Sequence, residues 1–421
     1  MRCTTMIKLA ELDKFICDYI KANWRSSMNE PVGTLKYKFL DPAADYRGQL
    51  WDWDSFFCGM ALIDVYDDTA DYLEGCVRNF IDNQADDGSI PYMIDVGGKK
   101  DFTYALPISD RKNRDSKSEL NSIKPLLAQM AKMVYEKKKD ISFYEDIYPA
   151  LRRHIWHWEN TQITNIGLFV WRSQRGSGTD NHPAVYGRPL NSSMAVELNC
   201  FMFLEYSAMS SIANEIGKTD DSKIFYDKAC ILTEKINSHM WDPVDEIYYH
   251  LDAMSKDPKV NNQKITWDVP LKFKTWTSFV PMYAEIAPKH YADLLVKKHL
   301  LNKDEFWSEY GVRTMAKNEP AYNTAETSNP SNWQGPIWII STYIVFKGLL
   351  NYGYINEARK IAENVLKNLY RDICENGAMH EYYNPETGKS DINLGFMNWN
   401  ALAGLMIKEL HGYEKGVDKG E

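Results

Sequence analysis

The sequence predicts an all-α protein, an (α/α)6 barrel in which helical hairpins close into a ring. Two observations predict this fold. Segments with an apolar period near 3.6 residues cover most of the chain. Between them lie six connections that each place a turn before an apolar or aromatic pair. About a dozen helices and six such loops fit six hairpins, although their uneven spacing also allows an irregular all-helical domain.

The individual helices are expected where the periodicity runs between start and stop signals. Gly217, Gly353 and Gly377 each follow a helical segment, where a left-handed residue commonly ends a helix. A helix over 1–20 carries charges that exclude a signal peptide. The other expected helices are 55–65, 70–84, 122–137, 143–160, 194–216, 220–240, 276–286, 291–300, 336–351, 355–376 and 397–410, with strand-like pieces at 247–251 and 378–383.

Composition narrows the class of protein. The apolar fraction is 44% and no linker or low-complexity tract divides the chain, so we expect one domain over 1–421. The net charge of −9 argues against nucleic acid or an anionic membrane as the main partner. The 7 cysteines are odd in number and form no Cys-x-x-Cys, and no apolar run is long enough to span a membrane. We therefore expect a soluble, cytoplasmic protein, with homo-oligomerisation left open.

Two Trp-Asp pairs stand in tandem at Trp51-Asp52-Trp53-Asp54, followed by Ser55-Phe56-Phe57. Indole rings cover the apolar face of a pyranose, and carboxylates accept hydrogen bonds from its hydroxyls. This pairing favours a sugar-binding segment. The alternative is that one tryptophan packs in the core while the aspartates cap a helix that begins at Ser55.

Two further segments carry the carboxylates best suited to acid–base chemistry. Asp180 follows Arg175-Gly-Ser-Gly178-Thr179, where glycines permit close approach of a ligand and aromatic neighbours permit desolvation. Glu381 precedes the turn at 384–388 and could deprotonate a water. The alternatives are an ordinary loop aspartate and a solvent-facing hairpin glutamate. Rival carboxylates are Glu309, Glu326 and Asp391.

A fourth segment, Asn332-Trp333-Gln334-Gly-Pro-Ile-Trp338, combines neutral amides with indoles and suits the recognition of sugar hydroxyls. No nucleophile elbow, Walker loop, dinucleotide fingerprint or metal-ligand spacing occurs, so we expect no cofactor and no metal. Two separated carboxylates with aromatics and amides are the equipment of glycoside hydrolysis, with a small carbohydrate as partner. The predicted substrate contacts are Tyr46, Trp51, Trp53, Asp54, Phe57, Gln84, Lys124, Gly178, Arg188, Trp333, Gln334 and Trp338.

The four segments follow one another in the order found in the trehalase and processing α-glucosidase relatives, which are glycoside hydrolase families 37 and 63. In its compact size the chain most resembles the mannosylglycerate and glucosylglycerate hydrolases of family 63. The resemblance covers roughly residues 46 to 410. It implies an (α/α)6 barrel and an inverting mechanism, with Asp180 as general acid and Glu381 as general base. It also implies sugar contacts by Trp53, Asp54, Trp333 and Gln334.

Two departures from the family pattern bear on the substrate. Thr179 replaces the usual tryptophan before the acid, and Lys124-Pro-Leu126 stands where many relatives carry Pro-Pro. We expect an α-glucoside or α-mannoside of a small molecule such as glycerate, whose carboxylate Arg175, Arg188, Lys124 or His182 could bind. The alternatives are a neutral disaccharide such as trehalose or kojibiose, and a non-enzymatic sugar-binding protein. A glycoside phosphorylase ranks last, because no basic cluster surrounds Glu381.

Overall fold

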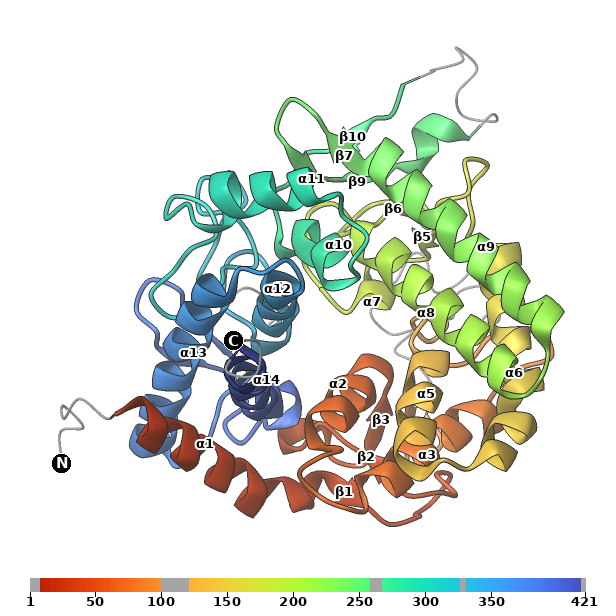
Figure 1. Ribbon diagram of the computed structural model, residues 1–421, viewed down its shortest axis with the longest axis horizontal. Helices are drawn as coiled ribbons and strands as arrows, with labels where there is room; N and C mark the ends of the chain where they lie inside the picture. The colour runs from red at the N-terminus through yellow and green to blue at the C-terminus, as the bar shows by residue number, and fades with distance from the viewer. Residues whose placement is uncertain (1–7, 100–120, 258–266, 326–330, 418–421) are drawn as a thin grey trace.

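The computed structural model describes residues 8–99, 121–257, 267–325 and 331–417, and in these ranges the helices form a closed ring (Figure 1). Helices that face the ring centre alternate along the chain with helices on the outside. Each inner helix contacts the next one, and the last contacts the first, so the ring closes. The predicted (α/α)6 barrel is confirmed.

The inner and outer helices differ in which faces they bury. Inner α8 and α12 are apolar around most of their circumference, as expected for helices packed on all sides. Outer α3 and α13 are amphipathic and bury one stripe. The inner helices are α2 (Asp52–Leu62), α5 (Leu127–Lys138), α8 (Val196–Glu215), α10 (Val280–Tyr283), α12 (Ile339–Asn351) and α14 (Leu402–Val417). The outer helices are α1 (Leu9–Asn23), α3 (Thr69–Asp82), α6 (Ile141–Thr161), α9 (Thr219–Lys235), α11 (Lys289–Leu294) and α13 (Ile355–Asn376).

Short elements fill the connections. The short helix α7 (Gln174–Ser177) lies in the loop that carries Asp180. Single 3-10 turns are η1 (Trp24–Ser27), η2 (Ala44–Tyr46), η5 (Ala253–Lys256), η6 (Trp276–Phe279) and η8 (Asn398–Ala401), and π turns are η4 (Ile236–Met240) and η7 (Leu295–Leu300). The strands are β1 (Met28–Asn29), β2 (Phe39–Leu40), β3 (Gln49–Trp51), β4 (Met93–Asp95), β5 (Val170–Trp171), β6 (Ser193–Met194), β7 (Trp241–Asp242), β8 (Ile247–Tyr248), β9 (His250–Asp252), β10 (Pro270–Leu271), β11 (Tyr382–Tyr383) and β12 (Ser390–Asp391).

All described strand pairs are antiparallel. A four-stranded sheet has the order β10-β9-β6-β5, and the pairs β1-β2, β3-β4, β7-β8 and β11-β12 form two-stranded sheets. In the four-stranded sheet Met194 lies opposite both Val170 and Leu251. This sheet and the β11-β12 hairpin brace the loops that carry Asp180 and Glu381.

Several helix boundaries differ from those predicted; the helices expected over 1–20, 122–137 and 397–410, for example, span Leu9–Asn23, Leu127–Lys138 and Leu402–Val417. Three differences concern the segments discussed below. Helix α2 begins at Asp52, so the aspartates lie inside its first turn, and Trp51 at the N-cap makes no side-chain capping bond. Helix α12 begins at Ile339 because Ile337 pairs with Tyr383 through two backbone hydrogen bonds. The segment 276–286 is a 3-10 turn followed by one α-helical turn. Gly217, Gly353 and Gly377 have φ of 74°, 81° and 81° and end their helices as predicted.

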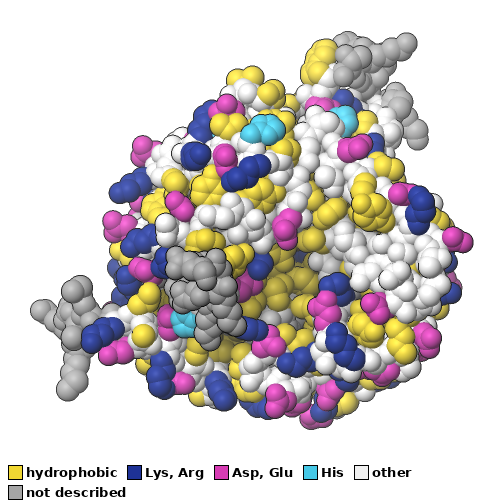
Figure 2. All heavy atoms as spheres, in the orientation of Figure 1, with side chains coloured by type: hydrophobic (Ala, Val, Ile, Leu, Met, Phe, Trp, Pro, Cys, Tyr) yellow, Lys and Arg dark blue, Asp and Glu magenta, His cyan; other side chains and the backbone are white. Residues whose placement is uncertain are grey.

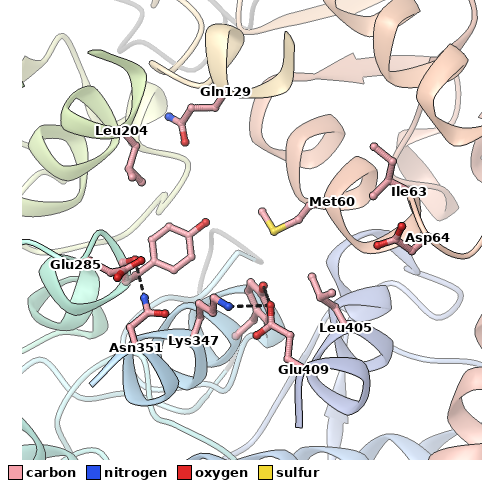
Figure 3. A pocket seen from close by; sticks show the side chains of 12 residues that line it. Met60, Ile63, Asp64, Gln129, Leu204, Glu285, Lys347, Asn351, Leu405 and Glu409 are labelled. Carbon is pink, nitrogen blue, oxygen red and sulfur yellow. Dashed lines mark hydrogen bonds and ion pairs between the residues drawn. The ribbon is translucent and has the colours of Figure 1, made fainter. Parts of the chain in front are cut away.

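The centre of the ring is hollowed. Figure 2 shows hydrophobic side chains on the floor of this hollow. A cavity of about 370 Å³ is lined by residues from every inner helix, among them Met60, Leu204 and Tyr343 (Figure 3). Tyr343 and Lys347 both bind Glu409 there, at 3.2 and 3.1 Å. Predicted substrate contacts do not line this cavity. Most of them lie in the segments that precede or open the inner helices.

Candidate active site

The Trp-Asp segment leaves strand β3 and enters α2 directly, which buries its carboxylates. Asp52 is fully buried and pairs with Lys124, whose ammonium and backbone N–H lie 3.0 and 2.9 Å from its oxygens. The same ammonium lies 4.8 Å from the centre of the Trp53 ring. Lys124 therefore contacts both Asp52 and the indole of Trp53, and the carboxylate of Asp52 compensates its positive charge.

Asp54 lies in the first turn of α2 and is held from the far end of the chain. The Asn398 side-chain amide donates to its carboxylate, and the Cys58 thiol donates to the side-chain oxygen Oδ1 of Asn398 at 2.9 Å. Burial, and then repulsion by Asp52, raise the pKa of Asp54 to about 7, although Lys124 and Asn398 oppose the shift. The Asp54 carboxyl is therefore only partly ionised at neutral pH.

We name residues 174–186 the Asp180 loop. Gly178, with φ of 74°, packs on the indole of Trp53, since a Cβ at this position would lie 2.7 Å from its Cζ2. Thr179 is buried, and its hydroxyl lies 3.0 Å from that of Ser177. Asp180 itself is half-buried. Burial raises its pKa, while Arg175, a hydrogen bond from Ser331 and Lys124 oppose the shift.

The Asp180 loop is tied to the Asn332–Trp338 segment through Asn181. The Asn181 amide donates to the Asn332 side chain at 3.0 Å, and its oxygen accepts from the Trp333 N–H at 2.7 Å. The Gln334 side chain donates to the Asn181 carbonyl oxygen at 2.9 Å. Two segments about 150 positions apart in the sequence are therefore one rigid unit.

The indoles of this unit are stacked. The rings of Trp333 and Trp338 are 4.1 Å apart and nearly parallel, and Trp333 approaches Trp53 at 5.7 Å. Trp338 is covered on its other side by Tyr382 at 4.8 Å, and its indole N–H donates to the Asn332 carbonyl oxygen. Trp338 therefore supports Trp333 from behind, and Trp333 is the member of the pair that reaches the Trp-Asp segment.

We name residues 380–393 the Glu381 hairpin, built on β11 and β12. Glu381 is buried, 4% exposed, and accepts a hydrogen bond from the Asn393 side chain. Burial raises its pKa to about 8, and repulsion by Asp54 and Asp180 adds to the shift against the Asn393 bond. Asp372 on outer helix α13 accepts from the His380 backbone N–H at 2.9 Å and from the Tyr383 hydroxyl at 2.8 Å.

Tyr46 shows that these segments converge on one place. Its ring meets Trp51 and Phe396 edge-on, at 6.0 and 5.9 Å. Burial and then the charges of Glu381, Asp54 and Asp180 raise the pKa of its hydroxyl, against a hydrogen bond with Asn393. Three carboxyl groups from distant parts of the chain thus act on one phenol.

Some predicted substrate contacts lie elsewhere or are already engaged. The Gln84 amide donates to the carbonyl oxygens of Gly88 and Ala150 and so fastens a loop to outer helix α6. Arg188 pairs with Asp252 at 2.8 Å. Phe57 is fully buried against Phe56. These residues shape the scaffold. Thr179, the first departure from the family pattern, directs its hydroxyl to Ser177 of the same loop.

Sequence analysis missed the amides that hold the carboxylates. Asn398 and Asn393 contact Asp54 and Glu381 and were not singled out. Asn398-Trp399-Asn400 repeats the amide–indole–amide pattern of Asn332-Trp333-Gln334, and this repetition was the available signal. Among the described residues, no group of three His, Cys, Asp or Glu side chains is arranged to hold a metal ion, and no described helix has the length and apolarity to cross a membrane.

The barrel and its convergent carboxylates, amides and indoles define a glycoside hydrolase. Residues 47–400 match the family described as "Mannosylglycerate hydrolase MGH1-like glycoside hydrolase domain". The chain belongs to this family, as the resemblance of its motifs predicted.

Individual relatives are distant. A mannosylglycerate hydrolase of Thermus thermophilus is 23% identical over 87% of this chain and 96% of its own length. A probable mannosyl-oligosaccharide glucosidase of Schizosaccharomyces pombe is 24% identical over 65% of this chain, which spans 35% of that protein. A crystal structure of a family 63 mannosylglycerate hydrolase from Thermus thermophilus superposes over 94% of this chain and 100% of its own, with a TM-score of 0.68 and 18% identity. Neutral trehalase Nth1 of Saccharomyces cerevisiae gives 0.62 over 94% of this chain and 81% of its own, with 15% identity. These structures share the fold.

Proposed function

We propose that the protein hydrolyses an α-glucoside or α-mannoside of a small molecule with inversion, using Asp180 as general acid and Glu381 as general base. The observation that carries the proposal is that the Asp180 loop and the Glu381 hairpin both reach the Trp-Asp segment. Gly178 packs on Trp53, and the 398–400 segment binds Asp54 through Asn398 and the His380 carbonyl oxygen through Asn400 at 2.8 Å. The charges of Asp180, Glu381 and Asp54 accordingly all raise the pKa of Tyr46. Of the rival carboxylates, Glu309 is exposed and Glu326 lies outside the described residues. Asp391 lies in β12, where its carboxylate accepts the Ile392 N–H at 3.0 Å.

In the proposed reaction Asp180 is protonated and donates its proton to the glycosidic oxygen as the bond to the anomeric carbon breaks. Glu381 is ionised and removes a proton from a water that attacks the opposite face of that carbon. Inverting enzymes hold the two carboxyl groups about 6.5–9.5 Å apart to make room for this water. Trp53 and Asp54 hold the sugar, with Trp333 and Gln334 on the adjoining segment.

The coupling among the carboxyl groups disfavours the state in which all are ionised. Asp180 and Glu381 repel each other when both are ionised, and one proton shared by the pair removes that repulsion. The proposed reaction uses the state in which Asp180 holds this proton and Glu381 is ionised.

The charges near Asp180 favour a leaving group that carries a carboxylate. Lys124 is paired with Asp52 and Arg188 with Asp252. Burial lowers the pKa of His182 to about 3, so His182 is uncharged at neutral pH. Arg175 remains. It is half-buried, acts electrostatically on Asp180, and among the described residues forms no ion pair or hydrogen bond through its guanidinium. A general acid lies beside the leaving group, so Arg175 lies on the side where the glycerate of a glycerate glycoside would bind.

The test compares glucosylglycerate, mannosylglycerate, trehalose and kojibiose on the same enzyme, with proton NMR of the first-released anomer. We expect hydrolysis of a glycerate glycoside with release of the β-anomer. Arg175→Gln should raise KM for that substrate by about tenfold or more, the scale of a hydrogen bond to a charged group. Arg188→Gln, whose wild-type partner is Asp252, is the matched control and should leave KM close to normal. Preference for a neutral disaccharide would contradict the assignment of Arg175, and release of the α-anomer would contradict inversion.

A further inference from the structure

A buried polar cluster joins the Asp180 loop to the four-stranded sheet and to inner helix α8. It consists of His182, His250 and Glu197, which are each at most 2% exposed and come from three separate elements. The rings of His182 and His250 are stacked 4.8 Å apart at 16°. His250 belongs to β9 in the four-stranded sheet, and Glu197 lies in the first turn of inner helix α8.

The hydrogen bonds of His182 define its tautomer. Its Nδ1 accepts from the Ala184 backbone N–H at 3.1 Å, so in the neutral ring the proton lies on Nε2. Nε2 then donates to the Thr275 hydroxyl at 3.0 Å. Burial lowers the pKa of His182 to about 3 and keeps the ring neutral. His182 therefore joins the Asp180 loop to the segment before η6 in one fixed orientation.

Glu197 sets the direction of the rest of the cluster. One of its oxygens accepts from the Trp171 indole N–H at 2.8 Å, and the other lies 3.2 Å from His250 Nε2. The Val196 N–H faces His250 Nδ1 at 3.5 Å, which again leaves the ring proton on Nε2, the nitrogen that approaches Glu197 without an aligned hydrogen bond. Burial opposes the ionisation of Glu197, but the neighbouring imidazoles and Trp171 lower its pKa to about 2.

The two residues that follow Asp180 in the chain are both anchored. Asn181 is bonded to the Asn332–Trp338 segment, and His182 is stacked on His250 while its backbone N–H donates to the Thr179 carbonyl oxygen at 2.9 Å. Burying three polar side chains stabilises a core less well than apolar residues of similar size. Hydrogen bonds and stacked rings instead fix direction, which is what a carboxyl group needs in order to meet one lone pair of the leaving oxygen.

We propose that His182, His250 and Glu197 are positioning residues that hold the Asp180 carboxyl in line with the glycosidic oxygen. This inference rests on the proposed role of Asp180 as general acid. It predicts that disturbing the cluster weakens proton donation and leaves the attack by water intact. The two steps are separable, because a leaving group that departs as a weak base does not need the proton.

The experiment measures His182→Asn and Glu197→Gln on two substrates with the same sugar, namely the natural-type O-glycoside and the α-glycosyl fluoride. We expect kcat for the O-glycoside to fall by about tenfold or more, part of the general acid contribution. For the fluoride, kcat should stay within about threefold of the wild type, since the general acid contribution is not needed there. Both substrates are measured on one preparation, so the ratio of their rates does not depend on the fraction of folded protein.

His154→Asn is the matched control. His154 is also fully buried and neutral, but it lies on outer helix α6. Its substitution should leave the ratio of the two rates unchanged. The inference is overturned if His182→Asn and Glu197→Gln each lose kcat equally on the two substrates. It is also overturned if neither variant loses kcat on either substrate. The proposed role of Asp180 is tested separately by Asp180→Asn. That role is wrong if this variant loses as much kcat on the α-glycosyl fluoride as on the O-glycoside.

Discussion

The Asp180 loop and the Glu381 hairpin present two carboxyl groups to one site by different physical means. The Asp180 loop is held mainly by neutral groups, namely the Asn181 amide bonds and the His182 stack, and its carboxyl group is half-buried beside Arg175. The Glu381 hairpin is held by the carboxylate of Asp372, and Glu381 is buried with other acidic groups nearby.

The difference matches the two proposed tasks. A general acid must reach a leaving group that enters from outside, so its loop needs a fixed direction and an open side. A general base must hold one water in an enclosed place, and burial raises the proton affinity of its carboxylate, which strengthens it as a base. The two carboxyl groups should therefore respond differently to substitution, to the choice of leaving group and to pH.

The largest effect is expected for Asp180→Asn and Glu381→Gln. Each should lower kcat on an O-glycoside by more than about a hundredfold, because each removes one proton transfer. The two variants should then separate on the α-glycosyl fluoride, where Asp180→Asn regains most of the lost rate and Glu381→Gln does not. Near-normal turnover in either variant on the O-glycoside would remove the corresponding assignment.

Gly178→Ala tests the contact between the Asp180 loop and the Trp53 indole. A Cβ at position 178 would lie 2.7 Å from Cζ2 of Trp53, so the loop or the ring must shift. We expect kcat/KM to fall by about tenfold or more, since small displacements of catalytic groups have large effects. Gly217→Ala is the control, because Gly217 has the same φ of 74° and nothing within 4 Å of the added Cβ. Similar kinetic losses in both variants would show that backbone strain alone is responsible.

The ring of helices could be predicted from the sequence because amphipathic periodicity and glycine stops are local signals. The carboxylates proposed to act could also be predicted, since Asp54, Asp180 and Glu381 stand beside aromatic residues or glycines in the sequence. The residues that aim them could not. Asn398 is ordinary as a residue, and it matters only because the closed ring brings it to Asp54, 344 positions away. His182 is a candidate charge by residue type, but its burial makes it neutral, which no local pattern indicates.

The pH dependence of kcat/KM tests the electrostatics of the Glu381 hairpin. Burial, followed by repulsion from Asp54 and Asp180, raises the pKa of Glu381 to about 8. The acidic limb of kcat/KM, which reports ionisation of the base in the free enzyme, should therefore lie at least about one unit above the pH expected for a solvated glutamate, about 4.3.

Asp54→Asn removes one of the repelling charges and should move that limb to lower pH, by about half a unit to one unit. Asp45→Asn is the control, because Asp45 also repels Glu381 but is exposed and screened by solvent. Its shift should be smaller. An acidic limb that stays at the same pH in Asp54→Asn would mean that the two carboxyl groups are not coupled.

The smallest effect is on stability, and it has opposite signs at two glutamates of the same hairpin. The pKa of Glu381 is raised from 4.5 to about 8, so the folded protein binds more protons than the unfolded chain between these values, and stability is lost as pH rises through this window. Glu381→Gln abolishes this loss. Its Tm should exceed that of the wild type by about 1–3 °C at pH ~8 and match it near pH ~4.5.

Glu386 gives the contrast. Burial opposes its ionisation, but Lys317, Tyr322 and Arg313 bind it and lower its pKa to about 2, so its contribution to stability is present above the unfolded pKa of 4.5 and is lost as pH falls toward 2. Glu386→Gln should therefore lower Tm at pH ~8, and the difference from the wild type should shrink as the pH is lowered toward about 3. Thermal unfolding followed by circular dichroism at both ends of the range checks both signs. A lower Tm for Glu381→Gln than for the wild type in the alkaline buffer would show that the buried base stabilises the fold, and that the charge repulsion inferred among Asp54, Asp180 and Glu381 is absent.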